Sequence, residues 1–373
     1  MRILHIASFL GNIGDNFNHL GTRKLLEEKL GKVEWFEIEI RETFRKNYTF
    51  DHNFADYCNT FDAVIFGGGN FFELWVDYSV NNTSANIPFE VVDKITVPFY
   101  FYALGVDPGM GVTKKGINKF MKWVEHVNNK DNFHLSTRND GAFDTLQKYF
   151  PEGFDENFTH LADGGFLVNT REILDEIEEK EQKYIGINLA GDMLDIRFDG
   201  ELSYEKFIIK FSASLCNILE NYKEYNILLI PHIFRDYNVV FDILNQVEDT
   251  YRRERIDVAG LYQGNDGMID TINSYNKCSI VLANRFHSNV IGLVLDKKVF
   301  GLFNYRQIKD LYKEINQVNY FDIRSNEGLD NLFESIQKTL SNNSNVSKSL
   351  LQDYLNESRK KTFDYFQELW IKD

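Results

Sequence analysis

Short runs of apolar and β-branched residues alternate along the chain with longer segments in which apolar residues recur at helical spacing. In the first half of the chain these runs predict strands, at 2–9, 33–40, 61–69, 97–105, 133–138 and 160–168. Segments with helical spacing follow several of them, at 18–30, 114–128 and 141–149. This alternation is typical of a parallel sheet covered by helices on both faces.

A charged segment at 169–183, predicted to be a linker helix, separates this series from a second one. The second series predicts strands at 183–190, 225–232, 256–262, 279–285 and 298–303. Its helices are predicted at 204–221, 239–247, 267–277, 288–295 and 307–315. We therefore expect an α/β protein with two tandem Rossmann-like domains, at 1–170 and 171–325, and a helical C-terminal tail at 326–373 that could pack back against the first domain.

The loops after the strands are where chemistry should be sought, because ligands of open α/β sheets bind beyond the carboxyl ends of the strands. With two such domains, the cleft between them is the expected site.

Composition narrows the function. The chain has 373 residues and a net charge of -15, which disfavours nucleic acid as a partner. Three cysteines without paired spacing or neighbouring histidines indicate neither a metal site nor a disulfide framework. No apolar run reaches the roughly 18 residues of a membrane helix and no signal peptide is evident, so we expect a cytoplasmic protein. Because the net charge is negative, an anionic substrate would have to be held by individual cationic side chains.

The first strand is followed by "GNIGD", a tight loop before a helix. Gly11 and Gly14 allow the backbone to approach a ligand, and the loop with Asn12 offers polar groups next to the helix N-terminus. Asp15 could take part in chemistry there, or could simply be an acidic residue favoured at the start of a helix.

The third strand runs into "GGGN", where Gly68, Gly69 and Asn70 predict a loop that is approached closely by a ligand or by another backbone segment. The spacing matches neither the dinucleotide fingerprint nor the P-loop.

Two strand ends carry charged residues with two interpretations each. Arg138 follows the strand at 133–138 and could bind a carboxylate or phosphate, or could form a structural salt bridge with Asp140 or Asp163. His232 lies just past a strand of the second domain and could contact substrate, although a single histidine is more often structural.

Arg285 and His287 are more informative, because they stand between an all-apolar strand and a helix, where a ligand of the second domain should lie. Arginine can neutralise an oxyanion, and histidine can exchange a proton near neutral pH.

Together, "GNIGD", "GGGN", "STRND", "LADGG" and "NRFHSNVIGLVLDKKVFGLFNYRQIK" resemble the polysaccharide pyruvyl transferase family over residues 1–315. The resemblance implies a glycosyltransferase B-like fold, and its Arg-x-His motif falls on Arg285 and His287. The family's Tyr followed by Lys falls on Tyr305 and Lys309, which adds both to the expected substrate-binding residues.

The resemblance also implies a reaction. The enolpyruvyl group of phosphoenolpyruvate is transferred to a sugar of a cell-surface polysaccharide, such as a capsule or exopolysaccharide, and a cyclic pyruvate ketal forms with release of phosphate. No cofactor is implied. The acceptor would lie on the first domain and could be lipid-linked, with peripheral membrane association; phosphoenolpyruvate would lie on the second. His287 would be the acid, Arg285 would hold the donor, and Asp15 would orient or deprotonate an acceptor hydroxyl.

The chain departs from the family at two motifs. The usual Arg-Asp-x-x-Ser has Asn139 and Ala142 at its Asp and Ser positions, and the usual Asp-Pro-Ala is Asp163 followed by two glycines. The alternatives are a nucleotide-sugar-dependent glycosyltransferase with the same architecture and a non-catalytic sugar-binding relative.

Overall fold

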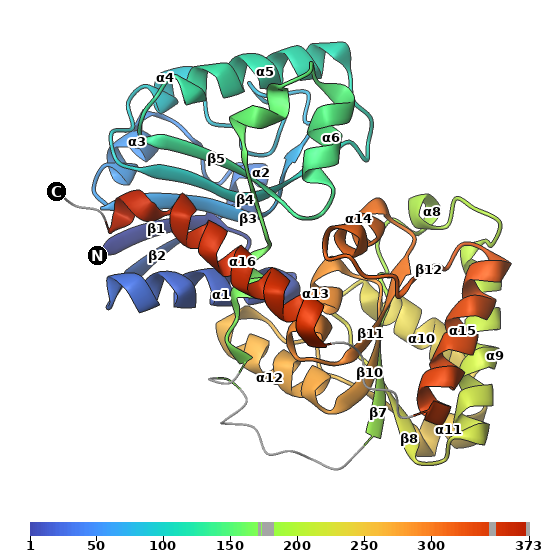
Figure 1. Ribbon diagram of the computed structural model, residues 1–373. Helices are drawn as coiled ribbons and strands as arrows, with labels where there is room; N and C mark the ends of the chain where they lie inside the picture. Colours follow the sequence, from blue (N-terminus) through green and yellow to red (C-terminus); the bar gives the residue numbers. More distant parts are fainter. Residues whose placement is uncertain (171–172, 174–182, 343–347, 371–373) are drawn as a thin grey trace. The chain divides into compact units, whose positions relative to one another are not determined.

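The computed structural model describes residues 1–170, 173, 183–342 and 348–370. The predicted linker helix at 169–183 lies almost entirely outside these residues. Two compact units are present, and each contains one sheet (Figure 1). Unit 1 comprises residues 1–10, 18–168 and 355–373, and unit 2 comprises residues 11–17 and 169–354.

Two parts of this division differ from the predicted domains. Residues 11–17 group with unit 2, and the tail is divided at 354–355 between the two units. Of the two long C-terminal helices, α15 (Asn326–Asn342) therefore belongs to unit 2, whereas most of the described end of the chain belongs to unit 1.

Unit 1 is built on a parallel sheet of six strands in the order β2-β1-β3-β4-β5-β6. Its strands are β1 (Arg2–Ala7), β2 (Glu34–Glu39), β3 (Ala63–Glu73), β4 (Phe99–Asp107), β5 (Phe133–Arg138) and β6 (Thr159–Leu161). Its helices before the C-terminal segment are α1 (Ile13–Leu30, which begins in unit 2), α2 (Arg41–Phe44), α3 (His52–Cys58), α4 (Phe89–Val92), α5 (Lys114–Asn128) and α6 (Ala142–Tyr149).

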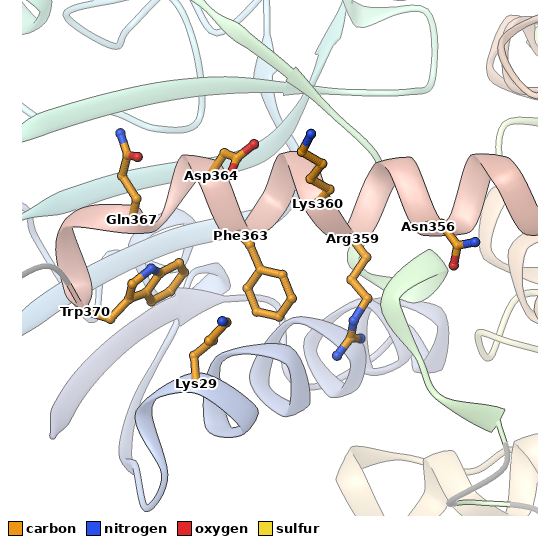
Figure 2. Close-up of a pocket in the computed structure, with 8 residues that line it drawn as sticks. All are labelled: Lys29, Asn356, Arg359, Lys360, Phe363, Asp364, Gln367 and Trp370. Atoms are coloured by element: carbon orange, nitrogen blue, oxygen red, sulfur yellow. The ribbon is translucent and has the colours of Figure 1, made fainter.

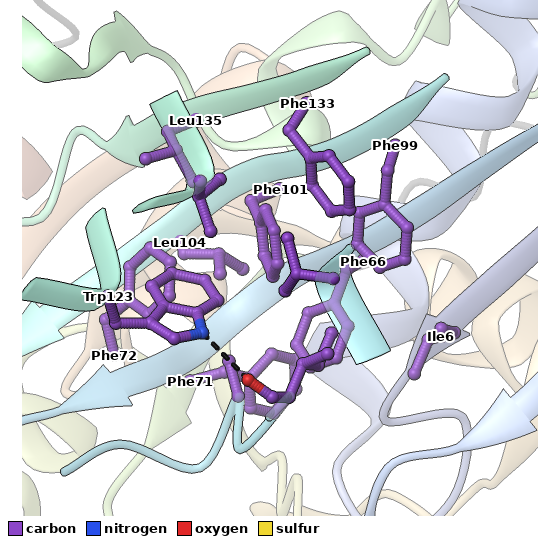
Figure 3. Close-up of a cluster of buried hydrophobic side chains, with 14 of the residues drawn as sticks. Ile6, Phe66, Phe71, Phe72, Phe99, Phe101, Leu104, Trp123, Phe133 and Leu135 are labelled. Carbon is purple, nitrogen blue, oxygen red and sulfur yellow. Dashed lines mark hydrogen bonds between the residues drawn. The ribbon is translucent and has the colours of Figure 1, made fainter. Parts of the chain in front are cut away.

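The core of unit 1 is aromatic. Phenylalanines of β3, β4 and β5 pack with Trp123 of α5 on one face of the sheet (Figure 3). The indole of Trp123 donates a hydrogen bond to the carbonyl of Ile87, so its one polar atom is satisfied where the ring is buried. Aromatic residues on the apolar strands thus supply packing in this region.

Unit 2 has a second parallel sheet of six strands, in the order β12-β11-β10-β7-β8-β9. Its strands are β7 (Lys183–Asn188), β8 (Tyr225–Leu229), β9 (Ile256–Val258), β10 (Cys278–Ala283), β11 (Lys298–Phe303) and β12 (Tyr320–Asp322). Its helices before α15 are α8 (Leu194–Arg197), α9 (Tyr204–Asn221), α10 (Asp236–Gln246), α11 (Asp249–Glu254), α12 (Gly264–Asn276), α13 (Phe286–Val294) and α14 (Arg306–Glu314).

The end of the chain packs on unit 1 through α16 (Lys348–Tyr365) and the short helix after it. Phe366 is completely buried, and the hydroxyl of Tyr365 donates hydrogen bonds to the carbonyls of Phe101 and His134. Figure 2 shows Phe363 and Arg359 directed from α16 toward the helix that carries Lys29, across a pocket of about 510 Å³. Two of the cations that line this pocket are engaged: Arg359 pairs with Glu28, and Lys29 lies over the ring of Phe363.

Two predictions for unit 1 are corrected by the structure, and in unit 2 the strands predicted at 225–232 and 256–262 end at Leu229 and Val258. The segment with Gly68, Gly69 and Asn70 is no loop, because β3 continues through it to Glu73. The predicted strand at 160–168 is short, since β6 ends at Leu161 and a 3-10 turn occupies Gly164–Leu167. Strand β12 was not predicted, because its three residues give too short a pattern. Within the described residues, no helix is long and apolar enough to span a membrane.

Candidate functional site

The topology of unit 2 contains one point at which the chain reverses its direction across the sheet. From β7 the chain proceeds outward to β8 and β9, and it then returns to place β10 on the other side of β7. Asn188 and Ala283, at the carboxyl ends of these strands, are register partners. In doubly wound sheets the connections on either side of such a point leave a crevice that binds ligands. The first residues after β10 therefore lie where a ligand is expected, and they include Arg285.

Arg285 is held there by two carboxylates. Its Nε donates to Asp236 at 2.8 Å, and its Nη2 donates to Asp236 and to Asp192. Burial lowers the pKa of the guanidinium, but the attraction of Asp236 and Asp192 outweighs this effect and leaves the pKa above its usual value. The backbone N–H of Arg285 donates to Asn188 Oδ1, which fixes the residue to the end of β7. Arg285 is thus charged, oriented and 12% exposed at the side chain.

A second arginine extends this cluster. Arg197 Nη2 lies 3.5 Å from Asp192 Oδ2, and its guanidinium lies 5.3 Å from the ring centre of Tyr305. Tyr305 is the residue before α14, so the cluster reaches the end of β11. Two arginines and two aspartates cancel in charge, and an arriving anion must therefore compete with a carboxylate. Asp192, at 21% exposure, is the more accessible competitor, because Asp236 is 1% exposed.

His287 lies in the first turn of α13, and the loop "GNIGD" packs against it within unit 2. Its Nδ1 is 3.7 Å from Asp15 Oδ1, and Asn12 Nδ2 donates to the same oxygen at 3.3 Å. A Cβ on Gly14 would lie 2.5 Å from His287 Cβ, so this position accepts only glycine if the imidazole stays in place. The structure brings Asn12, Gly14, Asp15 and His287 together.

Gly11 belongs to the same loop and has φ +91, a conformation that favours glycine. Its N–H donates to Gln263 Oε1 at 2.6 Å, so a residue of unit 2 holds the start of the loop.

His232 is completely buried beneath this region. Its Nε2 lies 2.7 Å from the hydroxyl of Tyr275, which in turn donates to Ser288. Burial lowers the pKa of His232 to about 3, with Asp236 opposing the shift. We predicted a direct contact between His232 and the substrate, but the surroundings of His232 do not support it. The imidazole is neutral and enclosed, and it contacts the hydroxyl of Tyr275.

Three asparagines that the sequence reasoning passed over connect the strand ends. Asn188, Asn284 and Asn304 directly follow or end the apolar runs of β7, β10 and β11. Asn284 Nδ2 donates to Asn304 Oδ1 at 2.9 Å, and Asn304 Oδ1 also accepts from Arg197. The repeated pattern of an apolar strand closed by Asn was the available signal. Asp192 and Arg197 gave none, because Asp192 lies in an irregular segment after β7 and Arg197 ends α8, a helix of four residues that is too short to show helical spacing.

Lys309, the last predicted residue of this unit, is exposed on α14, with its ammonium 6.0 Å from the ring centre of Phe303. No contact joins it to the cluster around Arg285 among the described residues.

Arg138 in unit 1 forms the structural salt bridge that was one of its two interpretations. Its Nη2 donates to Asp140 at 2.7 Å and its Nη1 lies 3.5 Å from Asp163. All three side chains are buried, and Asn18 donates to Asp163 while Asn139 accepts from the Asp163 N–H. This arrangement ties the ends of β5 and β6 together, and it gives no support to a guanidinium presented to substrate.

The glycines of β3 make room for protein, not for a ligand. A Cβ at Gly68 would lie 2.5 Å from Asn18 Nδ2, and one at Gly69 would lie 2.6 Å from the ring of Phe71. Asn70 donates to Asp107 at 3.1 Å. Gly67 approaches the carbonyl of Tyr102 on β4, which agrees with close approach of another backbone segment.

Several solved structures are similar to this chain in fold. The S. aureus MnaA–UDP co-structure has a TM-score of 0.53 and 11% identity, covering 100% of this chain and 98% of that one. The UDP-GlcNAc 2-epimerase from Neisseria meningitidis bound to UDP-GlcNAc has a TM-score of 0.53 and 10% identity, covering 99% and 100%. A glycosyltransferase from Rickettsia africae ESF-5 has a TM-score of 0.50 and 10% identity, covering 99% and 95%.

At such low identities the likeness shows the fold alone. It confirms the predicted class, two tandem Rossmann-like domains of the glycosyltransferase B-like type with a helical C-terminal segment. The family is shown by sequence: the family model of polysaccharide pyruvyl transferase matches residues 12–307, and the chain belongs to this family. No curated protein sequence matches the chain.

Proposed function

We propose that the chain transfers the enolpyruvyl group of phosphoenolpyruvate to a sugar, forming a cyclic pyruvate ketal and releasing phosphate. Membership of the family supports the class of reaction. The observation that carries the proposal is the convergence of a charged arginine and a His–Asp pair in unit 2, at the residues after β10.

In this proposal Arg285 binds the anionic donor. Asp236 holds Nε and Nη2 of the guanidinium and so fixes its plane, while Asp192 is the partner that a carboxylate or phosphate can displace. Arg197 then supplies a second positive charge, because it loses the same partner. Arg285 and Arg197 would then stabilise the negative charge of the donor in place of water, although the protein as a whole is acidic.

His287 is the proposed acid. Its proton adds to the methylene carbon of phosphoenolpyruvate, and a sugar hydroxyl attacks the adjacent carbon and forms a C–O bond. The bond between that carbon and the phosphate oxygen then breaks, and a second hydroxyl closes the ketal. Of the two hydroxyl protons, one balances the proton gained by the methyl group and the other leaves with phosphate. The Asp15 contact supports a further role for this carboxylate, which is to hold the His287 ring in position.

The test measures phosphate release from phosphoenolpyruvate with pyranosides that carry two neighbouring hydroxyls, including lipid-linked ones. His287→Gln should lower kcat by about 10²- to 10⁴-fold, as expected for loss of a general acid, while phosphoenolpyruvate binding persists. Arg285→Met should lose binding. Arg253→Met is the matched control, because among the described residues this exposed arginine pairs with Asp249 of its own helix and with no other residue.

Wild-type turnover in His287→Gln would contradict the proposal. Nucleotide release from a sugar nucleotide without consumption of phosphoenolpyruvate would instead indicate a glycosyltransferase. Binding without turnover across a broad glycan panel would indicate a non-catalytic relative.

A further inference from the structure

A loop of unit 1, between the end of β3 and α4, is fixed by buried polar side chains. Asn82 Nδ2 donates to the Leu74 carbonyl at 2.6 Å, and Asn81 Nδ2 donates to the Ala85 carbonyl at 2.6 Å. Thr83 donates through its N–H to Asn81 Oδ1 at 3.1 Å. Hydrogen bonds from side chain to backbone satisfy the turns locally, so the loop is ordered without a helix or strand.

This ordered loop carries two aromatic side chains, of which Tyr78 is exposed and Trp75 is partly buried. Tyr78 is 77% exposed, and Trp75 lies three residues before it. Both line a pocket of about 470 Å³. The pocket is lined by Phe44, Glu73, Trp75, Val76, Asp77, Tyr78 and Ser84. The hydrogen bonds of the loop order the backbone that carries both aromatic residues, so a ligand that contacts them would have little conformational entropy of the loop to overcome.

The pocket lining includes a carboxyl group, that of Glu73, with a buried oxygen and a raised pKa. Glu73 is the last residue of β3, and its Oε2 is buried without a hydrogen-bond partner among the described residues. Burial raises the pKa of Glu73 to about 7, against the opposing effect of hydrogen bonding by Ser84. A buried oxygen of this kind needs a donor, and a ligand hydroxyl would supply one.

The charge of the lining restricts the ligand. The lining contains two carboxyl side chains, of Glu73 and Asp77, and no lysine or arginine. The nearby ammonium of Lys119 donates to the carbonyls of Asp77 and Ser79, so this pocket suits a neutral ligand better than an anion such as phosphoenolpyruvate. Aromatic faces suit the C–H face of a sugar ring, and carboxylate oxygens suit its hydroxyls.

We propose that this pocket binds a neutral pyranose ring of the acceptor glycan, stacked on Trp75 and Tyr78 with its hydroxyls directed at Glu73. The identification of the ligand as the acceptor rests on the proposed function. The pocket adds a second recognition element, on unit 1, to the cationic cluster of unit 2, and each is defined by contacts within its own unit.

The test measures binding of methyl gluco-, galacto- and mannopyranosides by ligand-observed NMR, without phosphoenolpyruvate. Tyr78→Ala and Trp75→Ala should each weaken binding by roughly 3- to 10-fold, the range expected for loss of one aromatic contact. Glu73→Gln should also weaken it, because the acceptor oxygen that is left can take fewer hydroxyl donors. Tyr57→Ala is the control, since this exposed tyrosine lies on α3 outside the pocket lining.

The results separate this proposal from the proposed function. Pyranoside binding that depends on Tyr78, in a protein that never consumes phosphoenolpyruvate, would support the pocket and contradict the reaction. Turnover with unchanged acceptor KM in Tyr78→Ala and Trp75→Ala would support the reaction and overturn the pocket. Failure of every pyranoside to bind, or stronger binding of an amino sugar cation than of the neutral sugar, would also overturn it.

Discussion

Two arginines that follow apolar strands, one in each unit, have different surroundings. Arg138 ends β5 of unit 1 and is 4% exposed at the side chain, between Asp140 and Asp163 at 1% and 0%. Arg285 follows β10 of unit 2 and is 12% exposed, with one buried partner and one partner, Asp192, that is 21% exposed. Of these four ion pairs, the one between Arg285 and Asp192 has the most exposed carboxylate.

Position in the sheet accounts for the difference. In unit 1 the chain reverses direction between β1 and β3, and β5 is separated from that point by β4. In unit 2 the reversal lies between β7 and β10, beside Arg285. An arginine away from the reversal is enclosed by neighbouring loops and becomes structural, whereas an arginine at the reversal keeps an open side.

The largest expected effect is on the stability of unit 1. Arg138→Met leaves the Asp140 and Asp163 carboxylates buried without their cation, so the free energy of unfolding should fall by about 3 to 5 kcal/mol. Arg285→Met should cost less, because Asp192, one of its two carboxylate partners, is 21% exposed and water can solvate it once the guanidinium is gone. Chemical denaturation of both variants measures the contrast, and equal losses would contradict it.

The sequence predicted this comparison only in part. Alternating apolar and amphipathic segments were enough for the two sheets, because strands buried on both faces give a strong local pattern. "STRND" and "ANRFH" look equivalent as strand ends. The partners of Arg138 were among its predicted salt bridges, but Asp192, the partner that distinguishes Arg285, lies 93 residues away in the sequence and was not predicted. Side-chain neighbours across a sheet depend on strand order, which the pattern of residues along a chain does not encode.

The contacts between candidate residues were likewise not predictable from the pattern along the chain. Asp15 and His287 were predicted separately, yet the reason for Gly14 became visible only with the imidazole against it. Glu73 gave no signal at all, because one glutamate after an aromatic pair looks like an ordinary end of a strand. The pKa of Glu73 is raised by burial, and burial depends on the fold and not on the local sequence.

A second prediction concerns the pH dependence of the stability of unit 2, through the buried His232. The pKa of His232 is lowered by burial to about 3, so protonation opposes folding as the pH falls below the ordinary value of 6.5. Its contribution to stability is complete above pH 6.5 and is lost progressively down to about 3. His232→Gln should remove this dependence, which is of the order of a few kcal/mol. Denaturation at several pH values measures it, with exposed His52→Gln as the control.

A third prediction concerns the loop that holds His287. Gly14→Ala places a Cβ 2.5 Å from His287 Cβ and 2.7 Å from Nδ1, so the imidazole must move. Alanine favours the helix that begins here, so stability should not fall through helix propensity, whereas kcat should fall by roughly 10- to 100-fold. The decisive control is the double variant with His287→Gln, in which Gly14→Ala should have little further effect. Additive losses would show that Gly14 acts elsewhere.

The smallest expected effect shows which carboxylate partner of Arg285 an anionic ligand can displace. Asp192→Asn removes the accessible carboxylate with which an anion competes, so phosphoenolpyruvate should bind more tightly, by roughly 3- to 10-fold or about 1 kcal/mol. Asp236→Asn should weaken binding, because this buried carboxylate orients the guanidinium through Nε and Nη2. Calorimetric titration of both variants measures the two signs. If both substitutions weaken binding, Asp192 serves as a fixed support like Asp236, and the contrast between Arg138 and Arg285 would reduce to a difference in exposure.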